Sequence, residues 1–281
     1  MVRVSRNCPW NKCAFCSVYK GERFSLRAVD EVVADLDAML EYYGDRVRTI
    51  FLQDANPLLT KPDDLVAILD ALRERFPNAK RITAYARSHT LARRDPEDLR
   101  RLREAGLDRV HVGMESGCDA VLTMVRKGTT QAEQIEAGRR AIAAGFELSE
   151  YWMPGLGGQE HTATHAAASA DAVRAISPTF VRLRTTAVLQ GTPLAALRDT
   201  GAFTPMGELE VVDEIRRFLE GLGDLQVRIE SDHMLNLLME IEGDLPRDRD
   251  RLLRICDDVL AAPEHVQRAF VQARRTGRRF L

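Results

Sequence analysis

Residues 7–16 read N-C-P-W-N-K-C-A-F-C and lie just after a short apolar segment at residues 2–4, from which Ser5 and Arg6 separate them. They place three cysteines, Cys8, Cys13 and Cys16, in a C-x4-C-x2-C run. The proline in the first gap fixes its own φ and restricts the residue before it, which favours a bent loop. Such a loop lets three sulfur atoms turn toward one point. Soft thiolates of this kind bind zinc, copper(I) or an iron–sulfur cluster.

The number of cysteines limits the choice of metal. A structural zinc site is usually closed by four ligands, and no fourth Cys or His lies near the run, since Cys118 and Cys256 are far away in sequence. Three cysteines around a four-iron cluster leave one iron open for another ligand. A zinc knuckle and a set of reduced core cysteines stay open as alternatives. The Asn, Lys and Pro residues in the run weigh against the core, because these residue types are rarely buried completely.

Composition and charge exclude several classes of protein. The chain has 281 residues, of which 45% are hydrophobic and 29% charged, as in a globular protein rather than a disordered one. A formal net charge of −2 gives no overall attraction to nucleic acid. No apolar run approaches the ~20 residues of a membrane-spanning helix, so no membrane partner is predicted. Five cysteines, three of them clustered, do not form a disulfide framework, which predicts a reducing, cytoplasmic location.

Strand-like and helical segments alternate along the chain. Strands are predicted to begin near residues 2, 47, 81, 109, 146, 179 and 225. Helices are predicted at 29–40 after an N-cap at Ser25, with Gly44 at its end, and at 63–76, 96–105, 131–144, 161–176 and 208–222. From residue 234 on the pattern is helical, with breaks at 243–246 and 262–263.

This alternation predicts an α/β fold with a parallel sheet. Six or seven βα units do not complete an eight-stranded barrel, so we expect a partial (β/α)6–7 TIM-like barrel with parallel strands. The core is predicted at residues 1–195 and a helical C-terminal extension, with a probable extra strand, at 196–281. The first strand begins almost at Met1, which leaves open whether the start is truncated relative to a natural gene.

The cysteine run, with the aromatic Phe15 before its last cysteine, resembles the cluster loop of the radical S-adenosylmethionine (SAM) superfamily. The usual spacing there is C-x3-C-x2-C, so this loop is one residue longer in its first gap. The resemblance implies a [4Fe–4S] cluster on Cys8, Cys13 and Cys16, and SAM as the second cofactor. It also implies a partial barrel, and reductive cleavage of SAM to a 5′-deoxyadenosyl radical that abstracts hydrogen from a substrate.

Candidate ligand residues follow the second and third strands, where parallel folds bind ligands. The superfamily often has G-G-E-P-L after the second strand, with the carboxylate on the methionine amino group. Here Asn56 occupies the Glu position and Asp54 stands two residues earlier. Either Asp54 substitutes as the anion or the contact is weaker; a plain polar turn is the alternative. After the third strand, Arg87 can bind a carboxylate through its planar fork, or lie at the surface.

The fourth strand ends in H-V-G-M-E-S-G at residues 111–117. This stretch resembles the branch of the superfamily that includes the Elongator catalytic subunit, oxygen-independent coproporphyrinogen dehydrogenase and the methylthiotransferases. By position, the resemblance implies that Glu115 and Ser116 contact the SAM ribose or methionine. Lys127 would lie where a basic residue meets the SAM carboxylate.

The fifth and sixth strands add further candidates. M-P-G-L-G-G-Q at residues 153–159 is similar to a stretch of the same branch whose backbone meets adenine, which implies contacts at Pro154 and Gly155. Arg182 and Arg184 lie two residues apart on the sixth strand and therefore share a face. Facing inward, Arg184 would meet SAM or an anionic substrate; facing outward, both arginines would be solvated.

The C-terminal residues carry no motif that we recognise. Asp232 and His233 fall near the end of the last predicted strand and are the candidate catalytic residues. A helix start capped by Asp232 is the alternative. Residues 274–279 form a basic tail that either contacts RNA phosphates or is solvated.

The resemblance implies a radical SAM enzyme acting on a small-molecule substrate, with flavodoxin or ferredoxin as electron donor. A non-catalytic haem- or metallocofactor-binding protein is the first alternative, favoured by Asn56 in place of the usual Glu. An RNA-modifying enzyme is the second. The near-neutral charge and the lack of an appended RNA-binding domain weigh against it.

Overall fold

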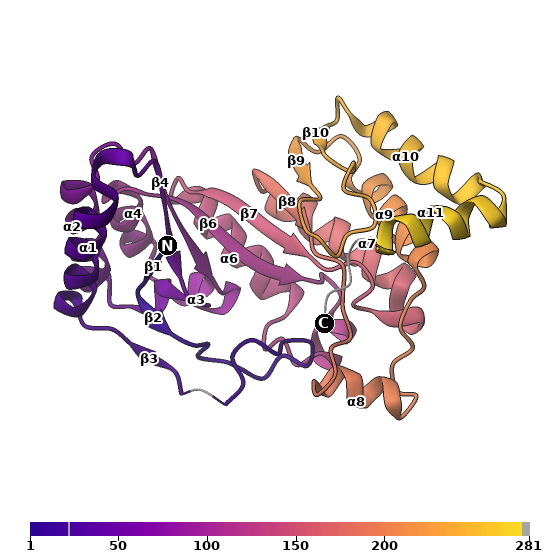
Figure 1. Ribbon diagram of the computed structural model, residues 1–281, viewed down its shortest axis with the longest axis horizontal. Coiled ribbons are helices and arrows are strands. Elements are labelled where there is room, and N and C mark those ends of the chain that lie inside the picture. The colour runs from indigo at the N-terminus through magenta and orange to yellow at the C-terminus, as the bar shows by residue number, and fades with distance from the viewer. Residues whose placement is uncertain (22, 277–281) are drawn as a thin grey trace. The chain divides into compact units, whose positions relative to one another are not determined.

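The computed structural model describes residues 1–21 and 23–276 of the chain (Figure 1). Its contacts divide the chain into two compact units. The first unit consists of Met1–Lys12, Val18–Gly113 and Ala132–Ser149. The second consists of Cys13–Ser17, Met114–Gln131 and Glu150–Leu281. Two strands, β6 (Leu107–Glu115) and β7 (Glu147–Trp152), begin in the first unit and end in the second.

The first unit is a parallel sheet with helices packed on it. Its strand order is β1-β4-β5-β6-β7, and the printed pairs β1/β4, β4/β5 and β5/β6 are parallel. Helix α1 packs against α2, and α2 against α4 (Figure 1). A second, two-stranded antiparallel sheet joins β2 to β3. The remaining bounds are β1 (Val2–Arg3), β2 (Ser5–Arg6), β3 (Ser25–Leu26), β4 (Thr49–Gln53), β5 (Arg81–Ala86), α1 (Val29–Tyr43), η1 (Gly44–Arg46), η2 (Pro57–Leu59), α2 (Pro62–Arg75), α3 (Ser88–Arg93), α4 (Pro96–Glu104) and α6 (Gln131–Ala143).

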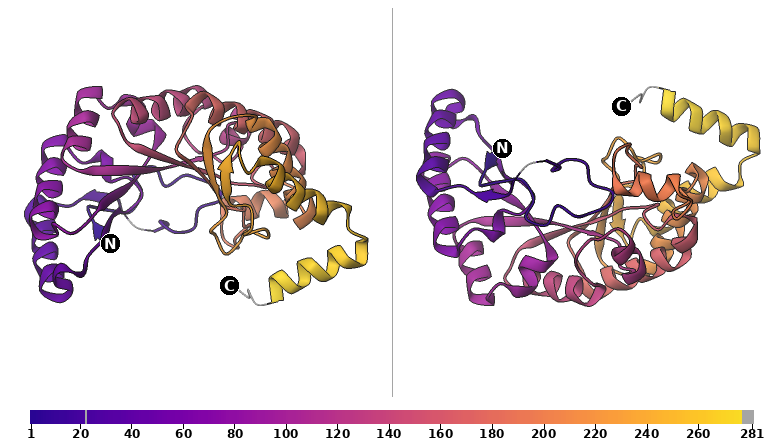
Figure 2. Two further views of the ribbon diagram at one scale, coloured as in Figure 1. Left: turned by 90° about the horizontal axis from the view of Figure 1, so that it is seen from above. Right: turned by 90° about the horizontal axis from the view of Figure 1, so that it is seen from below.

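The second unit continues the α/β pattern and ends in helices. Its strand order is β6-β7-β8-β9-β10; β8 and β9 are parallel, and β10 is antiparallel to β9. Helix α9 packs against α7, and α10 packs against α9 (Figure 1). Helix α11 follows α10 and is the yellow helix at the end of the ribbon (Figure 2). In the described part of the chain, no helix has the length and apolar character needed to cross a membrane. The bounds are β8 (Phe180–Leu183), β9 (Val227–Glu230), β10 (Gly243–Leu245), α5 (Asp119–Met124), α7 (Gly158–Ile176), α8 (Pro193–Asp199), α9 (Glu208–Leu222), α10 (Arg249–Ala261) and α11 (Glu264–Thr276).

Local patterns explain most of these elements. Helix α2 has proline in its first turn and acidic residues after it, which suits the amino end of a helix. Its apolar residues recur at helical spacing, and Leu65, Ile68, Leu69 and Leu72 are completely buried. Gly44 ends α1 with a φ of 57°, a conformation that glycine adopts without a steric penalty. Strands occur at all seven predicted positions.

The predicted N-cap at Ser25 is wrong. Ser25 belongs to β3, where it pairs with Arg6 of β2, and α1 begins only at Val29 after Ala28. Pairing with a strand distant in sequence therefore overrides the local capping preference of serine.

The prediction of a helical pattern from residue 234 on is also wrong for its first part. Residues 231–242 contain no helix, residues 243–245 form β10, and the next helix starts at Arg249. Three apolar residues of this irregular stretch, Leu237, Leu238 and Ile241, are buried, whereas Met234 and Met239 are exposed. Asp232 is consequently not the cap of a helix.

The predicted basic tail is described only as far as Thr276, and residues 277–279 lie outside the described residues. Arg274 forms an ion pair with Glu240. Arg275 forms one with Glu208 at 2.5 Å and donates to the carbonyl of Leu235 at 3.0 Å. Both arginines therefore interact within the second unit.

Candidate functional site

Cys8 is held in place by a series of hydrogen bonds in the first unit. The Asp54 carboxylate accepts the Asn7 backbone N–H at 3.1 Å and lies 3.4 Å from the Arg3 guanidinium. Asn7 has a φ of 71°, a region where asparagine is enriched among non-glycine residues. Its side-chain oxygen accepts the Cys8 N–H at 2.7 Å, and the Cys8 sulfur accepts the Asn11 N–H at 3.4 Å. Asp54 thus supports the backbone that presents Cys8.

The other two cysteines belong to a segment anchored in the second unit. Ala14, between them, is buried and donates its N–H to the Val125 carbonyl at 2.8 Å, while its own carbonyl accepts the Leu194 N–H at 3.0 Å. It packs in an apolar cluster completed by Val121, Val125, Leu156, Leu194 and Phe203. Phe15 packs against the same cluster. The segment from Cys13 to Cys16 is therefore fixed through its backbone and its apolar side chains.

The cysteines have the chemistry of cluster ligands. All five cysteines of the chain lie within the described residues and are thiols. The three cysteines of the C-x4-C-x2-C run are half-buried, so a ligand can reach them. Cys8 belongs to the first unit, and Cys13 and Cys16 to the second. Among residues 1–21 and 23–276, no three His, Cys, Asp or Glu side chains gather as a metal site. The donor type nevertheless fits iron–sulfur chemistry, since each cysteine supplies a soft thiolate.

The loop after β4 contains an asparagine whose side chain is hydrogen-bonded within the protein. Asn56 is completely buried; its amide nitrogen donates to the Thr90 hydroxyl at 2.7 Å, and its oxygen accepts the Arg87 N–H at 3.2 Å. The Arg87 guanidinium lies 5.4 Å from the centre of the Trp10 ring. Arg94 donates to the carbonyl of Thr60 at 3.0 Å. These contacts join the carboxyl ends of β4 and β5.

The end of β6 presents a buried ion pair. Glu115, with a φ of 64°, lies 2.9 Å from the Lys127 ammonium, and both side chains are less than one-sixth exposed. Ser116 is completely buried and accepts the Cys118 N–H at 2.9 Å. The Gly117 N–H donates to the Ser169 hydroxyl of α7 at 2.9 Å. The structure therefore brings three predicted residues, Glu115, Ser116 and Lys127, into one neighbourhood.

Glu150 is a functional candidate that the sequence analysis missed. It is buried in β7, and one of its carboxylate oxygens has no hydrogen-bond partner in the described part of the chain. Burial, and next the charge of Glu115, raise its pKa well above the ordinary value, although Lys127 opposes this. Folding therefore favours the protonated form of Glu150, and this form can donate a hydrogen bond. The predicted strand also contains Glu147 and Ser149, so no local signal in the sequence distinguished Glu150.

The loop after β7 is held at both of its predicted ligand residues. The Pro154 carbonyl accepts the Thr186 N–H at 2.9 Å. The Gly155 N–H donates to the Glu214 carboxylate at 2.5 Å, with Gly155 at a φ of 82°. These backbone groups are consequently fixed before any ligand arrives.

Charged residues cluster where β8 and β9 end. Asp232 lies 2.7 Å from Arg184 and also pairs with Arg182, which forms a further pair with Glu230. Burial raises the pKa of Asp232, but the hydrogen bond and charge of Arg184 outweigh it and hold the pKa below the usual range. Burial, and then the charge of Arg184, lower the pKa of His233. His233 is therefore neutral at pH 7, whereas Asp232 is ionised.

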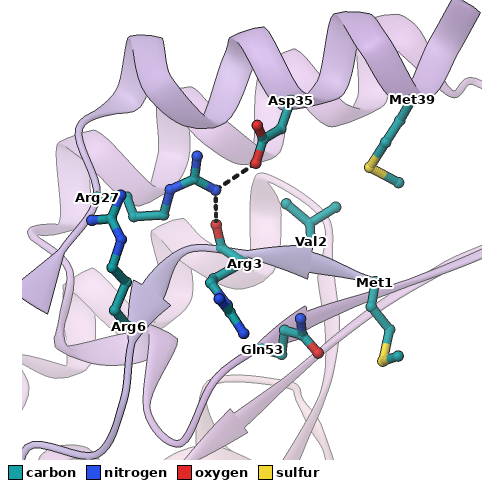
Figure 3. Close-up of a pocket in the computed structure, with 8 residues that line it drawn as sticks. All are labelled: Met1, Val2, Arg3, Arg6, Arg27, Asp35, Met39 and Gln53. Atoms are coloured by element: carbon teal, nitrogen blue, oxygen red, sulfur yellow. Dashed lines mark hydrogen bonds and ion pairs between the residues drawn. The ribbon is translucent and has the colours of Figure 1, made fainter. Parts of the chain in front are cut away.

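A polar pocket beside β1 contains three arginines (Figure 3). Arg27 donates to the Arg3 carbonyl at 2.9 Å and to Asp35 at 2.5 Å, as the dashed lines show. The hydrogen bond to Asp35 raises the pKa of Arg27. This guanidinium thus ties β1 to α1. The pocket is lined by Met1, Val2, Arg3, Arg6, Arg27, Asp35, Met39 and Gln53.

Comparison with known sequences identifies a family. A family model described as "Radical SAM superfamily" matches residues 2–168. The anaerobic magnesium-protoporphyrin IX monomethyl ester cyclase of Cereibacter sphaeroides is 27% identical over 154 residues, which cover 54% of this chain and 24% of that protein. The chain spans less than a third of the length of the curated relatives that it matches.

Two solved structures share the fold. Methylornithine synthase has a TM-score of 0.57 at 16% identity, covering 96% of this chain and 84% of its own. Coproporphyrinogen III oxidase from Escherichia coli has a TM-score of 0.55 at 19% identity, covering 69% and 46%. This likeness confirms the predicted α/β fold, a partial barrel with parallel strands.

Proposed function

The chain belongs to the radical SAM superfamily, and we propose that it is an enzyme that cleaves SAM on a [4Fe–4S] cluster held by Cys8, Cys13 and Cys16. One observation carries this proposal: three half-buried thiols stand in a C-x4-C-x2-C run, and this run lies within residues 2–168, which match the family model. Members of the family use this cluster and SAM, so the predicted cofactors are those of the family. When bound, the cluster supplies the electron that splits SAM into methionine and a 5′-deoxyadenosyl radical.

In the first unit, Asp54 and Arg87 are the residues proposed for the amino and carboxylate groups of SAM. Asn56 was also predicted as a contact, but both polar atoms of its amide already bind Thr90 and Arg87. This supports Asp54 as the anionic partner, since its carboxylate keeps acceptor capacity beyond the Asn7 N–H and Arg3.

In the second unit, the ribose is assigned to Glu115 and Glu150, with Ser116 beside them. An ionised Glu115 accepts from hydroxyl groups, whereas a protonated Glu150 donates to a hydroxyl oxygen, so the pair offers complementary roles. Lys127 holds Glu115 in place at 2.9 Å and, besides Arg87, is a second proposed cation for the SAM carboxylate. Pro154 and Gly155 are the proposed adenine contacts.

The substrate end of the site is assigned to Arg184, Asp232 and His233. A lowered pKa makes Asp232 a weak base, and its two arginine partners hold it in place. In a neutral His233, Nδ1 accepts the Leu235 N–H at 3.4 Å, which leaves the hydrogen on Nε2, where it can be donated to a substrate. We propose a small-molecule substrate, a flavodoxin or ferredoxin as electron donor, and a reducing cytoplasmic location that suits five thiols.

Anaerobic reconstitution tests the proposal. The reconstituted protein is expected to hold about four irons per chain and to show a reduced EPR signal that changes when SAM is added. With dithionite and SAM, it should release 5′-deoxyadenosine. A colourless product that binds only zinc would overturn the proposal.

A non-catalytic carrier of haem or another metallocofactor is a second candidate. The observation that favours it is the engagement of Asn56 by Thr90 and Arg87, at the position where the family often has a glutamate. The two candidates separate cleanly: a carrier binds haem in a spectroscopic titration and yields no 5′-deoxyadenosine under the conditions above.

A further inference from the structure

Glu214 of α9 is a completely buried carboxylate outside every motif of the family match. One oxygen accepts the Gly155 N–H at 2.5 Å, and the other lies 3.1 Å from Nδ1 of His165, which is also completely buried. We propose that Glu214 is a positioning residue of the SAM site, one that fixes the loop after β7 in place for adenine. This inference rests on the proposed role of Pro154 and Gly155.

The proton on His165 follows from its neighbours. Trp152 Nε1 lies 3.2 Å from His165 Nε2, and an indole nitrogen can only donate. Nε2 therefore carries the lone pair, and the hydrogen sits on Nδ1, from which it is donated to Glu214. The carboxylate thus accepts two N–H groups, one on each oxygen, which is the arrangement that makes a buried charge tolerable.

The surroundings keep water away from this carboxylate. Trp152 stacks on Phe218, which lies one helical turn beyond Glu214 on α9, with ring centroids 3.8 Å apart and planes 16° from parallel. Without Glu214, the Gly155 N–H and His165 Nδ1–H would be buried donors with no acceptor.

The loop after β7 is consequently held by hydrogen bonds at two adjacent residues, Pro154 and Gly155. The Thr186 N–H holds the Pro154 carbonyl at 2.9 Å, and Glu214 holds the Gly155 N–H. Gly155 has a φ of 82°, and a β-carbon there would lie 3.4 Å from the Val211 side chain of α9. The predicted C-terminal extension therefore takes part in shaping the cofactor site, although it carries no recognised motif.

Glu214→Gln tests this role in the reconstituted, cluster-containing protein. The amide keeps the shape of the side chain, but its NH2 group must face one of the two N–H donors, so one hydrogen bond is lost. We expect faster hydrogen exchange at the Gly155 amide and a dissociation constant for SAM that rises by about tenfold, the size expected for one hydrogen bond to a charged group. Iron content should stay unchanged, and KM for SAM should rise while kcat at saturating SAM is kept.

Leu222→Ala is the matched control, since Leu222 is a buried residue of the same helix, two turns beyond Glu214, and its side chain makes no hydrogen bond. It should lower the melting temperature and leave SAM affinity unchanged. If Glu214→Gln does not fold, Glu214→Asp keeps the charge but shortens the arm by one methylene, and should weaken SAM binding several-fold.

The outcomes are distinguishable. Wild-type protein that binds SAM, together with a folded Glu214 variant that binds it equally well, overturns this inference and leaves the proposed function standing. Wild-type protein that does not bind SAM overturns the proposed function and this inference with it. A rise in the dissociation constant for Leu222→Ala equal to that for Glu214→Gln would mean that Glu214 acts only through packing, and it also overturns the inference.

Discussion

Gly117→Ala is expected to destabilise the second unit strongly, because the loop after β6 touches the backbone of α7 at this glycine. A β-carbon on Gly117 would lie 2.4 Å from the Ala168 carbonyl oxygen, 2.7 Å from the Ser169 Cα and 2.8 Å from the Ala168 carbonyl carbon. All three are backbone atoms, which cannot turn away as a flexible side chain can. The loop or the helix must therefore move.

The size of the effect can be worked from two contributions. Overpacking a well-packed site costs about 1–3 kcal/mol. Separation of loop and helix also breaks the 2.9 Å hydrogen bond from the Gly117 N–H to the buried Ser169 hydroxyl. That loss adds about 1 kcal/mol, for a total of about 2–4 kcal/mol. In a chain of this size the melting temperature should fall by roughly 5–15 °C.

Thermal unfolding of the ligand-free protein, followed by circular dichroism, measures this. Gly207→Ala is the matched control, since its φ is −70° and its β-carbon would meet only the end of the Glu210 side chain, at 3.4 Å. The control should melt close to wild type. If Gly117→Ala and Gly207→Ala melt at the same temperature, the close approach of loop and helix is refuted.

Three further predictions concern cysteines and one buried acid. Cys13→Ala should abolish iron binding in anaerobic reconstitution and keep the circular dichroism spectrum, whereas Cys118→Ala should keep the iron; equal loss in both would make Cys118 a fourth ligand and remove the open iron site. Because the pKa of Glu150 is raised, its contribution to stability is complete below the unfolded-state pKa and is lost as pH rises through the folded-state pKa. Glu150→Gln should therefore flatten the fall in denaturant midpoint as pH rises above the ordinary glutamate value of 4.5, and parallel curves for variant and wild type would contradict this. Burial raises the pKa of Cys256 to about 12, so iodoacetamide should leave it unmodified in the native protein and label it after denaturation, as peptide mass spectrometry can show.

Local chemistry explains why much of the fold was predictable. The buried leucines of α2 recur at helical spacing, and Gly44 ends α1 as expected, because both signals act within a few residues of one another. Ser25 and the stretch from residue 234 were mispredicted because strand pairing decided them: β3 pairs with β2, and β10 pairs with β9. No local pattern reports a partner strand that lies elsewhere in the chain.

The same division holds for the candidate site. The sequence by itself determined the three thiolates and the family, because Cys8, Cys13 and Cys16 lie within nine consecutive residues whose spacing limits what they can bind. Only the tertiary structure decided which groups surround them. The pKa of Glu150 is raised because folding buries it and places it near the carboxylate of Glu115, and Glu214 holds Gly155 from 59 residues further along the chain. A pKa and a hydrogen-bond partner depend on neighbours in space, and those neighbours exist only once the chain has folded.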